Sequence, residues 1–377
     1  MIALDGPSRR TMLAGAAALA ATPLAAAAAP AGPRFAYVGC FTGDHGSNGK
    51  GIEVCRVDPA SGDWINIQTV GDLPNPYAVT VNPAKAVLYA GHSKGEMVSV
   101  FSIDRASGRL TPKSQLPVNG VSATNLTVDP SGRFLITANY ESGSASVFPI
   151  LADGDLGPIA DHIVFTGPLG PGRVEQATSH PHKVVFDPAG RFFCMPDKAL
   201  DRIVTLKLDP ASGKLQQLSI AKTRSGAGPR HMAFHPRLPF AYASGELDST
   251  LMTFAYRPDT GALSLIDILP TLPRAFVGDN APSTLDIHPS GLALYTVNRG
   301  QGGIAGFRID AGGRLTPAGW TIPEEKKAGT AQMTADGVLC LNTRTSVRRF
   351  KVDPATAKLT PMSQAAAITD GVGIAFL

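Results

Sequence analysis

Short apolar segments separated by polar turns recur along most of the chain. Six times an apolar strand, a turn centred on proline and a second apolar strand follow one another. These units cover residues 79–93, 126–141, 184–198, 232–246, 285–299 and, in weaker form, 331–344. Their turn centres are Pro83, Pro130, Pro188, Pro236, Pro289 and Ala335, which are 47, 58, 48, 53 and 46 residues apart. A period near fifty residues indicates a repeat architecture.

A second element follows each of these units: an alternating strand, a turn of the Asp-x-x-x-Gly kind and a short strand that begins with Leu. It occurs at 57–64, 103–110, 152–156, 208–215, 257–263, 309–315 and 352–359. There are thus seven turns of the second kind and six of the first. The unmatched strand is 35–42, and the chain ends in the apolar segment 371–377. A ring in which the first and last strands share one blade explains the mismatch.

The pattern therefore predicts an all-β protein, a seven-bladed β-propeller with four antiparallel strands in each blade. The abundant glycines and prolines, 40 and 31 in number, are spread along the chain as short strands with tight connections require. Two packed β-sandwiches are the alternative. That alternative does not account for one strand–turn–strand signature repeating throughout.

Residues 1–30 have the pattern of an export signal and are set apart from the predicted propeller domain, 31–377. Ser8-Arg9-Arg10-Thr11-Met12-Leu13 is a twin-arginine pattern, and an Ala/Leu-rich run with Ala-x-Ala cleavage points follows. The alternatives are an uncleaved membrane anchor or a disordered tail. The run is short and mostly alanine, which disfavours a stable membrane span after processing. We expect a periplasmic or secreted protein.

The cysteines fit either redox state, because twin-arginine export carries folded chains. Cys40 and Cys55 lie on neighbouring predicted strands and are candidates for a disulfide. Cys194 and Cys340 lie within apolar strands and read as small buried residues. No metal-type cysteine spacing occurs, so no metal site or cofactor is predicted. The alternative is an ion bound in the channel and shared by several blades.

Charge excludes one class of partner. The formal net charge is only +4, and no stripe of Lys and Arg alternates with aromatic residues. Nucleic acid is therefore not expected as a partner.

The turns serve as a ruler for finding residues at equivalent heights in the blades. Six residues before the turn centres Pro188 and Pro236 stand His182 and Arg230. Ten residues after the turn centres Pro236 and Pro289 stand Glu246 and Arg299. A hairpin places these two positions side by side at its open end, and the open ends gather at one mouth of the channel. One position nearer the turn come polar residues again, namely His92, Asn139, Asp197 and Asn298. Hydrogen-bonded ties between blades are the structural alternative.

Several segments resemble the lactonase family of seven-bladed propellers, which includes propeller-type 6-phosphogluconolactonase and carboxy-cis,cis-muconate cyclase. The segments that carry the resemblance are Tyr37-Val38-Gly39-Cys40-Phe41-Thr42, Ala138-Asn139-Tyr140-Glu141-Ser142-Gly143-Ser144, His180-Pro181-His182, Pro196-Asp197, Gly228-Pro229-Arg230-His231, Gly245-Glu246-Leu247 and Asn298-Arg299-Gly300. The resemblance implies that His182, Arg230, Glu246 and Arg299 form the active-site set. We expect His180, Asn139, Asp197, His231 and Asn298 to contact substrate.

This chain departs from the family pattern at two places near the predicted mouth. Lys198-Ala199 follows Asp197 where the family usually has Leu-Gly, and His92-Ser93 stands where Asn-Glu is common. Both changes bear on which substrate is bound.

The four residues supply the chemistry that opening a lactone requires. Histidine, with a pKa of about 6.5, can take a proton from water, and His182 is the first choice, with His180 as the fallback. Arg230 and Arg299 can stabilise an oxyanion, carboxylate or phosphate, and Glu246 can orient them or relay a proton. We expect hydrolysis of a sugar lactone, without phosphate if the protein is exported. The alternatives are a muconate-lactonising enzyme acting on a carboxylate, or a non-catalytic propeller that binds a protein or cell-wall ligand.

Overall fold

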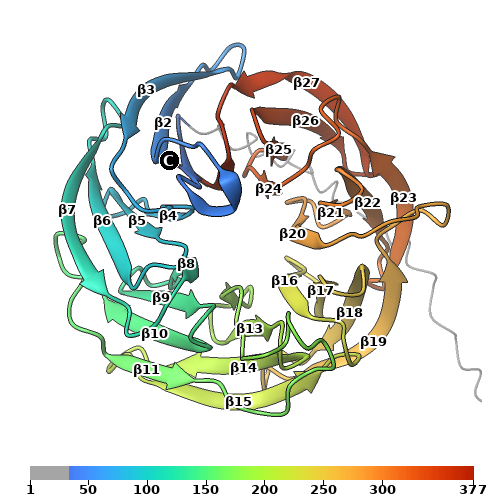
Figure 1. The fold of residues 1–377 in the computed structure, drawn as a ribbon. Coiled ribbons are helices and arrows are strands. Elements are labelled where there is room, and N and C mark those ends of the chain that lie inside the picture. Colours follow the sequence, from blue (N-terminus) through green and yellow to red (C-terminus); the bar gives the residue numbers. More distant parts are fainter. Residues whose placement is uncertain (1–33) are drawn as a thin grey trace, which may run out of the picture. The chain divides into compact units, whose positions relative to one another are not determined.

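The protein is a ring of seven four-stranded antiparallel sheets around a central channel (Figure 1). This computed structural model describes residues 34–377, so the predicted signal at 1–30 lies outside the described residues. The seven sheets confirm the predicted fold class. Within each sheet the order of strands follows the chain from the channel outward, except in the blade that holds both ends of the described chain.

The blades are numbered by the order in which the chain enters them. Blade 1 contains β28 (Gly371–Phe376), β1 (Phe35–Cys40), β2 (Ile52–Val57) and β3 (Trp64–Val70), with a short 3-10 helix, η1 (Asp44–Gly46), between β1 and β2. Blade 2 contains β4 (Ala78–Asn82), β5 (Val87–Gly91), β6 (Met97–Ile103) and β7 (Leu110–Pro117). Blade 3 contains β8 (Ala123–Val128), β9 (Phe134–Asn139), β10 (Ser144–Pro149) and β11 (Asp161–Val164).

The remaining blades have the same order. Blade 4 contains β12 (Val185–Phe186), β13 (Phe193–Asp197), β14 (Arg202–Leu208) and β15 (Leu215–Lys222). Blade 5 contains β16 (Pro229–Phe234), β17 (Phe240–Gly245), β18 (Thr250–Tyr256) and β19 (Leu263–Pro270). Blade 6 contains β20 (Pro282–Ile287), β21 (Ala293–Asn298), β22 (Gly303–Ile309) and β23 (Leu315–Thr321). Blade 7 contains β24 (Thr330–Met333), β25 (Val338–Asn342), β26 (Val347–Asp353) and β27 (Lys358–Ala366).

The ring closes within blade 1, as the unmatched first strand predicted. β28 pairs antiparallel with β1, with Ala36 opposite Phe376 and Val38 opposite Ile374. The innermost strand of this blade therefore comes from the end of the chain and the other three from its beginning. In Figure 1 the blue strands of blade 1 stand beside the red strands of blade 7.

The apolar core lies between blades. Seven clusters of buried side chains each join one blade to the next around the ring. The second strand of a blade is buried on both faces, as in β9 and β21, where all six residues are buried. The outermost strands are mostly exposed or half-buried instead, as in β7 and β27. Each blade thus depends on two neighbours to cover its faces.

Buried tyrosine hydroxyls tie a blade to the turn of the next one. Tyr37 donates to the carbonyl of Gly108 at 3.0 Å, Tyr89 to that of Gly154 at 2.7 Å and Tyr242 to that of Gly313 at 2.8 Å. Each acceptor is the glycine of the second repeated turn, with φ between 75° and 83°, a conformation that suits glycine. The equivalent Tyr295 in blade 6 has a buried hydroxyl without a hydrogen-bond partner among the described residues.

Cys40 and Cys55, the candidates for a disulfide, are not bonded to each other. All four cysteines are free and buried. The register places Cys55 opposite Ala36, four residues before Cys40 on the same strand, so neighbouring strands do not bring the two thiols opposite each other. Burial raises the pKa of the Cys55 thiol to about 12, so it stays protonated.

We found no helix in residues 34–377 that is long and apolar enough to cross a membrane.

The tyrosine ties give a matched pair of stability predictions. Tyr242→Phe removes a buried hydrogen bond and leaves the Gly313 carbonyl without its donor, so we expect it to lower the free energy of unfolding by about 1 kcal/mol. Tyr295→Phe removes a hydroxyl that has no partner, so no loss is expected. Urea unfolding followed by tryptophan fluorescence measures both variants. Equal losses in the two would contradict the assigned role of the tie.

Candidate functional site

The candidate site lies where the inner strands of blades 4 to 6 begin and their second strands end. His182 precedes β12, and Arg230 lies at the start of β16. Glu246 directly follows β17, and Arg299 directly follows β21. All four side chains thus belong to one mouth of the channel, because antiparallel hairpins put the start of one strand beside the end of the next.

A single carboxylate gathers cations from three blades. Glu246 Oε2 lies 2.7 Å from Arg230 Nε as an ion pair, and Arg299 Nη2 donates to Glu246 Oε1 at 2.9 Å. Lys198, which follows β13, brings its Nζ to within 3.4 Å of the same Oε1. The structure therefore brings together three of the four residues that the repeat ruler selected, and adds a lysine.

The cations determine the charge state of Glu246. Burial by itself raises the pKa of this carboxyl, and the charges of Arg230, Arg299 and Lys198 more than offset it, so the net pKa is lowered. Burial lowers the pKa of Arg230 to about 10, with Glu246 opposing the shift. Both groups are ionised at neutral pH. A buried carboxylate needs such partners, because an unpaired one is strongly destabilising.

A β-bulge directs two neighbouring residues of β16 to the channel. The pairing with β17 passes from Pro229–Gly245 to Met232–Ala243, so Arg230 and His231 face a single residue of the partner strand. Consecutive strand residues normally point to opposite faces, and a bulge relaxes that rule. Arg230 and His231 both line a cavity of about 100 Å³ in the channel, together with His182, Lys183 and Tyr77.

His182 is buried in this cavity with one ring nitrogen unused. Its backbone N–H donates to the Pro196 carbonyl at 3.0 Å, while Nδ1 has no partner among the described residues. Its ring lies 5.4 Å, centroid to centroid, from both Tyr140 and His231. Burial and the charge of Arg230 lower the pKa of His182 well below its usual value. A pKa near the unperturbed value, as predicted from the sequence, is therefore wrong for His182.

The two other histidines of the site have different surroundings. His180 stacks on Tyr140 with ring centroids 4.2 Å apart, and its Nδ1 lies 2.9 Å from the Tyr140 carbonyl oxygen. His231 lines the channel with Nδ1 3.5 Å from Lys183 Nζ. Burial and the charge of Lys183 lower the pKa of His231 well below its usual value.

Asn139, Asp197 and Asn298, expected to contact substrate, do not line the cavity. Asn139 is fully buried and bonds Ser144 and Ser146 at 3.1 Å, and Asn298 is held by Thr271 and Asn280. Asp197 accepts from Ser179 Oγ and from the backbone N–H groups of His180, Ala199 and Leu200. Because their polar groups are used inside the protein, these residues position the loops of the mouth. Their location at the mouth was predicted; their orientation was not.

Glu175 and the contacts of Lys198 were not predicted from the sequence. Glu175 lies on the long connection 165–184 between β11 and β12, and its Oε2 is 2.5 Å from Lys198 Nζ. The signal for this connection was the 58-residue separation between Pro130 and Pro188, the largest in the chain. Lys198 lies ten residues after Pro188, the position that Glu246 and Arg299 hold in the next two units, but its contact with Glu246 was not inferred from this.

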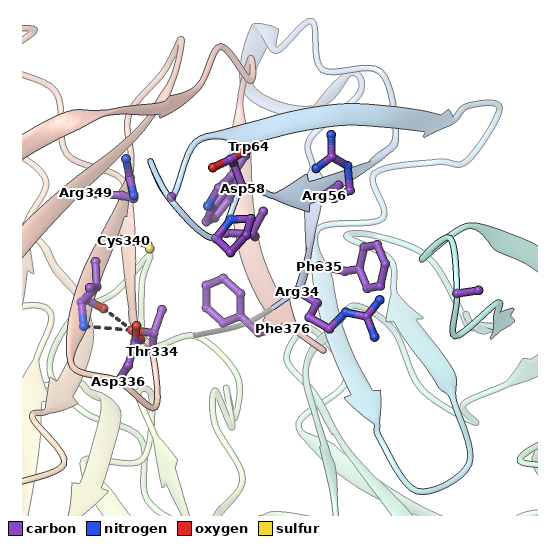
Figure 2. Close-up of a pocket in the computed structure, with 15 residues that line it drawn as sticks. Arg34, Phe35, Arg56, Asp58, Trp64, Thr334, Asp336, Cys340, Arg349 and Phe376 are labelled. Atoms are coloured by element: carbon purple, nitrogen blue, oxygen red, sulfur yellow. Dashed lines mark hydrogen bonds between the residues drawn. The ribbon is translucent and has the colours of Figure 1, made fainter. Parts of the chain in front are cut away.

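A larger cavity of about 670 Å³ opens at the opposite face, between blades 7 and 1 (Figure 2). Trp64, Phe35 and Phe376 supply apolar lining. Its carboxylates are engaged in turns: Asp58 accepts from the N–H groups of Ala60 and Ser61, and Asp336 accepts from Thr334. No histidine lines it, so it lacks the acid–base set found at the channel mouth.

Within residues 34–377, no group of three or more His, Cys, Asp or Glu side chains is arranged to hold a metal ion.

Comparisons with known proteins place the chain among lactonases. The family model described as "Lactonase, 7-bladed beta-propeller" matches residues 35–376. The chain is 30% identical to 6-phosphogluconolactonase of Bacillus subtilis over 276 residues, which are 73% of this chain and 77% of that protein. It is 29% identical to 6-phosphogluconolactonase of Serratia proteamaculans, over 79% of this chain and 87% of the relative.

Solved structures agree with these sequence relatives. A periplasmic gluconolactonase from Pseudomonas aeruginosa matches with a TM-score of 0.82 and 25% identity, covering 91% of this chain and 98% of that one.

A half-buried acid beside the channel gives a pH prediction. Asp286, on β20, accepts from the Met333 N–H at 3.1 Å. Burial raises its pKa to about 6, although Lys183 partly offsets the shift. The folded state thus binds more protons than the unfolded state between about pH 4 and 6, and stability from this group is lost as the pH rises through 6. Asp286→Asn should raise the free energy of unfolding by about 2 kcal/mol at pH 7.5 and by much less at pH 4. Urea unfolding at the two pH values tests this, and a pH-independent difference would contradict it.

Proposed function

The chain belongs to the lactonase family of seven-bladed β-propellers, and we propose that it hydrolyses a sugar lactone at the channel mouth of blades 4 to 6. The relatives support the reaction class: two are named 6-phosphogluconolactonase and one gluconolactonase. Those names differ in whether the lactone carries a phosphate.

The observation that carries the site assignment is a pair of unused polar atoms in one cavity. Arg230 Nη1 and His182 Nδ1 are both buried without a hydrogen-bond partner among the described residues, and both side chains line the channel cavity. Buried polar groups are nearly always hydrogen-bonded, so unused ones require an explanation. A lactone carbonyl oxygen and an attacking water would supply the two missing partners.

In the proposed reaction, neutral His182 takes a proton from water as the water oxygen attacks the lactone carbonyl carbon. The negative charge that develops on the carbonyl oxygen is stabilised by the Arg230 guanidinium. When the tetrahedral intermediate collapses, the bond to the ring oxygen breaks and the leaving alkoxide takes the proton from His182. One water is consumed and one hydroxy acid is formed.

Glu246 and Arg299 have supporting roles in this proposal. Glu246 fixes Arg230 through the ion pair at 2.7 Å, so the guanidinium does not have to reorganise during the reaction. Among the three cations around Glu246, which are Arg230, Arg299 and Lys198, the Arg299 side chain is the most exposed at 38%. In this proposal it faces the incoming substrate. His180 and His231 flank His182 as proposed substrate contacts.

The cavity accommodates the reacting group rather than a whole sugar. A volume of about 100 Å³ suffices for a carbonyl and a water, so the remainder of the substrate would lie over the rim near Arg299 and the 165–184 connection.

Export to the periplasm is part of the proposal. It rests on the twin-arginine pattern at Ser8–Leu13 and on the periplasmic Pseudomonas relative.

Replacing Arg230 or His182 tests the site. Arg230→Ala should lower kcat/KM for D-glucono-δ-lactone by about 100-fold or more, as loss of an oxyanion donor typically does. His182→Gln should cause a loss of about 100-fold through removal of the base. Acid release above the spontaneous rate measures both.

His288→Gln serves as the control, because His288 lies in the turn at the opposite face and bonds Ser290. It should retain full activity. Unchanged rates in both site variants would remove the assignment. Turnover of a muconate instead of a lactone would favour the cyclase alternative, and neither activity would favour a non-catalytic propeller.

The pH dependence follows from the state of His182. Because burial and Arg230 lower its pKa well below 6.5, the neutral form that accepts a proton persists into mildly acidic solution. We expect the acid limb of the kcat/KM profile to lie well below pH 6.5. An acid limb at pH 6.5 or above would contradict His182 as the base. Rates corrected for spontaneous hydrolysis between pH 4.5 and 7.5 provide the profile.

A further inference from the structure

Lys198 lies between two carboxylates at the rim of the candidate site. Its Nζ is 2.5 Å from Glu175 Oε2 and 3.4 Å from Glu246 Oε1, and it lies 5.6 Å from the centre of the Tyr140 ring. The Lys198 side chain is only 4% exposed, whereas that of Glu175 is 56% exposed. A buried cation is thus covered by an exposed anion from another loop.

The charge of Glu246 is already balanced by the two arginines, so Lys198 has no carboxylate of its own inside the rim. Arg230 and Arg299 already contact both oxygens of Glu246, at 2.7 and 2.9 Å. Lys198 is a third cation for one buried carboxylate, and without Glu175 the cluster carries an excess of two positive charges. A neutral lactone develops only one negative charge on its carbonyl oxygen, which Arg230 would meet. The second excess charge calls for a second anion.

Glu175 supplies this second anion, and its few contacts allow another anion to replace it beside Lys198. Its carboxylate makes no hydrogen bond or ion pair within residues 34–377 other than with Lys198. The loop itself is held by other groups: Gln176 Nε2 donates to the Lys198 carbonyl at 2.9 Å and Gly170 N–H to that of Ala199 at 2.8 Å. Glu175 can therefore swing into solvent while the loop and the lysine stay in place. The Glu175 side chain is 56% exposed, so water can hydrate its carboxylate once it leaves the pair, and Lys198 then keeps Glu246 and the incoming anion as partners.

We propose that Lys198 is a specificity-determining residue that exchanges Glu175 for an anionic substituent, a carboxylate or a phosphate, carried by the lactone. This inference rests on the proposed function and deepens it. Glu175 acts as an internal competitor that neutralises the lysine until an anionic substrate arrives. The lysine belongs to this chain's own departure from the family pattern, so it sets a preference that the shared residues do not.

Two substitutions with opposite expected effects test the exchange. Lys198→Met keeps the length of the side chain and removes the charge. We expect it to reduce the ratio of kcat/KM for anionic over neutral lactones by about tenfold, the loss of one charged hydrogen bond. Glu175→Gln removes the competitor and should raise that ratio severalfold. The lactones of glucaric acid and of 6-phosphogluconic acid, each compared with glucono-δ-lactone, distinguish a carboxylate from a phosphate.

A binding measurement separates this inference from the proposed function. Calorimetric titration of glucarate and 6-phosphogluconate, each relative to gluconate, reads the same selectivity without turnover. If the wild-type protein hydrolyses no lactone, the proposed function fails while the binding ratios still decide the role of Lys198. Ratios that stay unchanged in both variants, or that move in the same direction, overturn the inference. Glu175→Gln alters an exposed side chain, so its result stands even if Lys198→Met fails to fold.

Discussion

The pairing of β28 with β1 is the interaction on which the rest of the molecule depends. Every blade has two apolar faces, and each face is covered only by the neighbouring blade. An open row of blades would leave two faces exposed to water, at a cost proportional to their area. By completing blade 1, β28 supplies Ile374 to the cluster shared with blade 7. It also contributes Val372 and Ile374 to the wall of the channel.

The closed ring explains how a charged cluster can exist at its mouth. Glu246, Arg230, Arg299 and Lys198 come from three consecutive blades whose relative positions are fixed by the packed interfaces between them. Desolvation of these charges is unfavourable, and their mutual attraction offsets it only when the geometry is well maintained. The apolar interfaces therefore support the polar site. Within β16, the bulge places both Arg230 and His231 on the wall of the channel cavity.

The fold and part of the site could be predicted from the sequence because both follow the repeat. Equivalent turn positions must lie at equal heights, so the ruler located Arg230, Glu246 and Arg299 together. Side-chain orientation was not accessible in this way. Asn139 and Asn298 have the right height but point into hydrogen-bond networks between strands. The register between β1 and β2 keeps Cys40 and Cys55 from lying opposite each other. That two strands are neighbours along the chain does not reveal their register.

Features outside the repeat were the least predictable. The contact between Glu175 and Lys198 depends on how the long β11–β12 connection folds over the mouth, and no periodic pattern encodes that path. The extra length of that unit was visible, whereas the destination of its side chains was not. The lowered pKa of His182 likewise depends on burial and on a guanidinium from the next blade, which adjacency in the chain does not reveal.

Ring closure also orders the events of folding. The inner strand of blade 1, β28, is separated from its partner β1 by almost the full described length of the chain. The first blade to be synthesised is therefore the last to be completed. Until then β1 presents an unpaired edge, the kind of surface that promotes association between chains. A propeller closed in this manner gains from remaining with the folding machinery of the compartment where it is made. A translocation route that accepts only finished, compact cargo would spare it from crossing a membrane with that edge open.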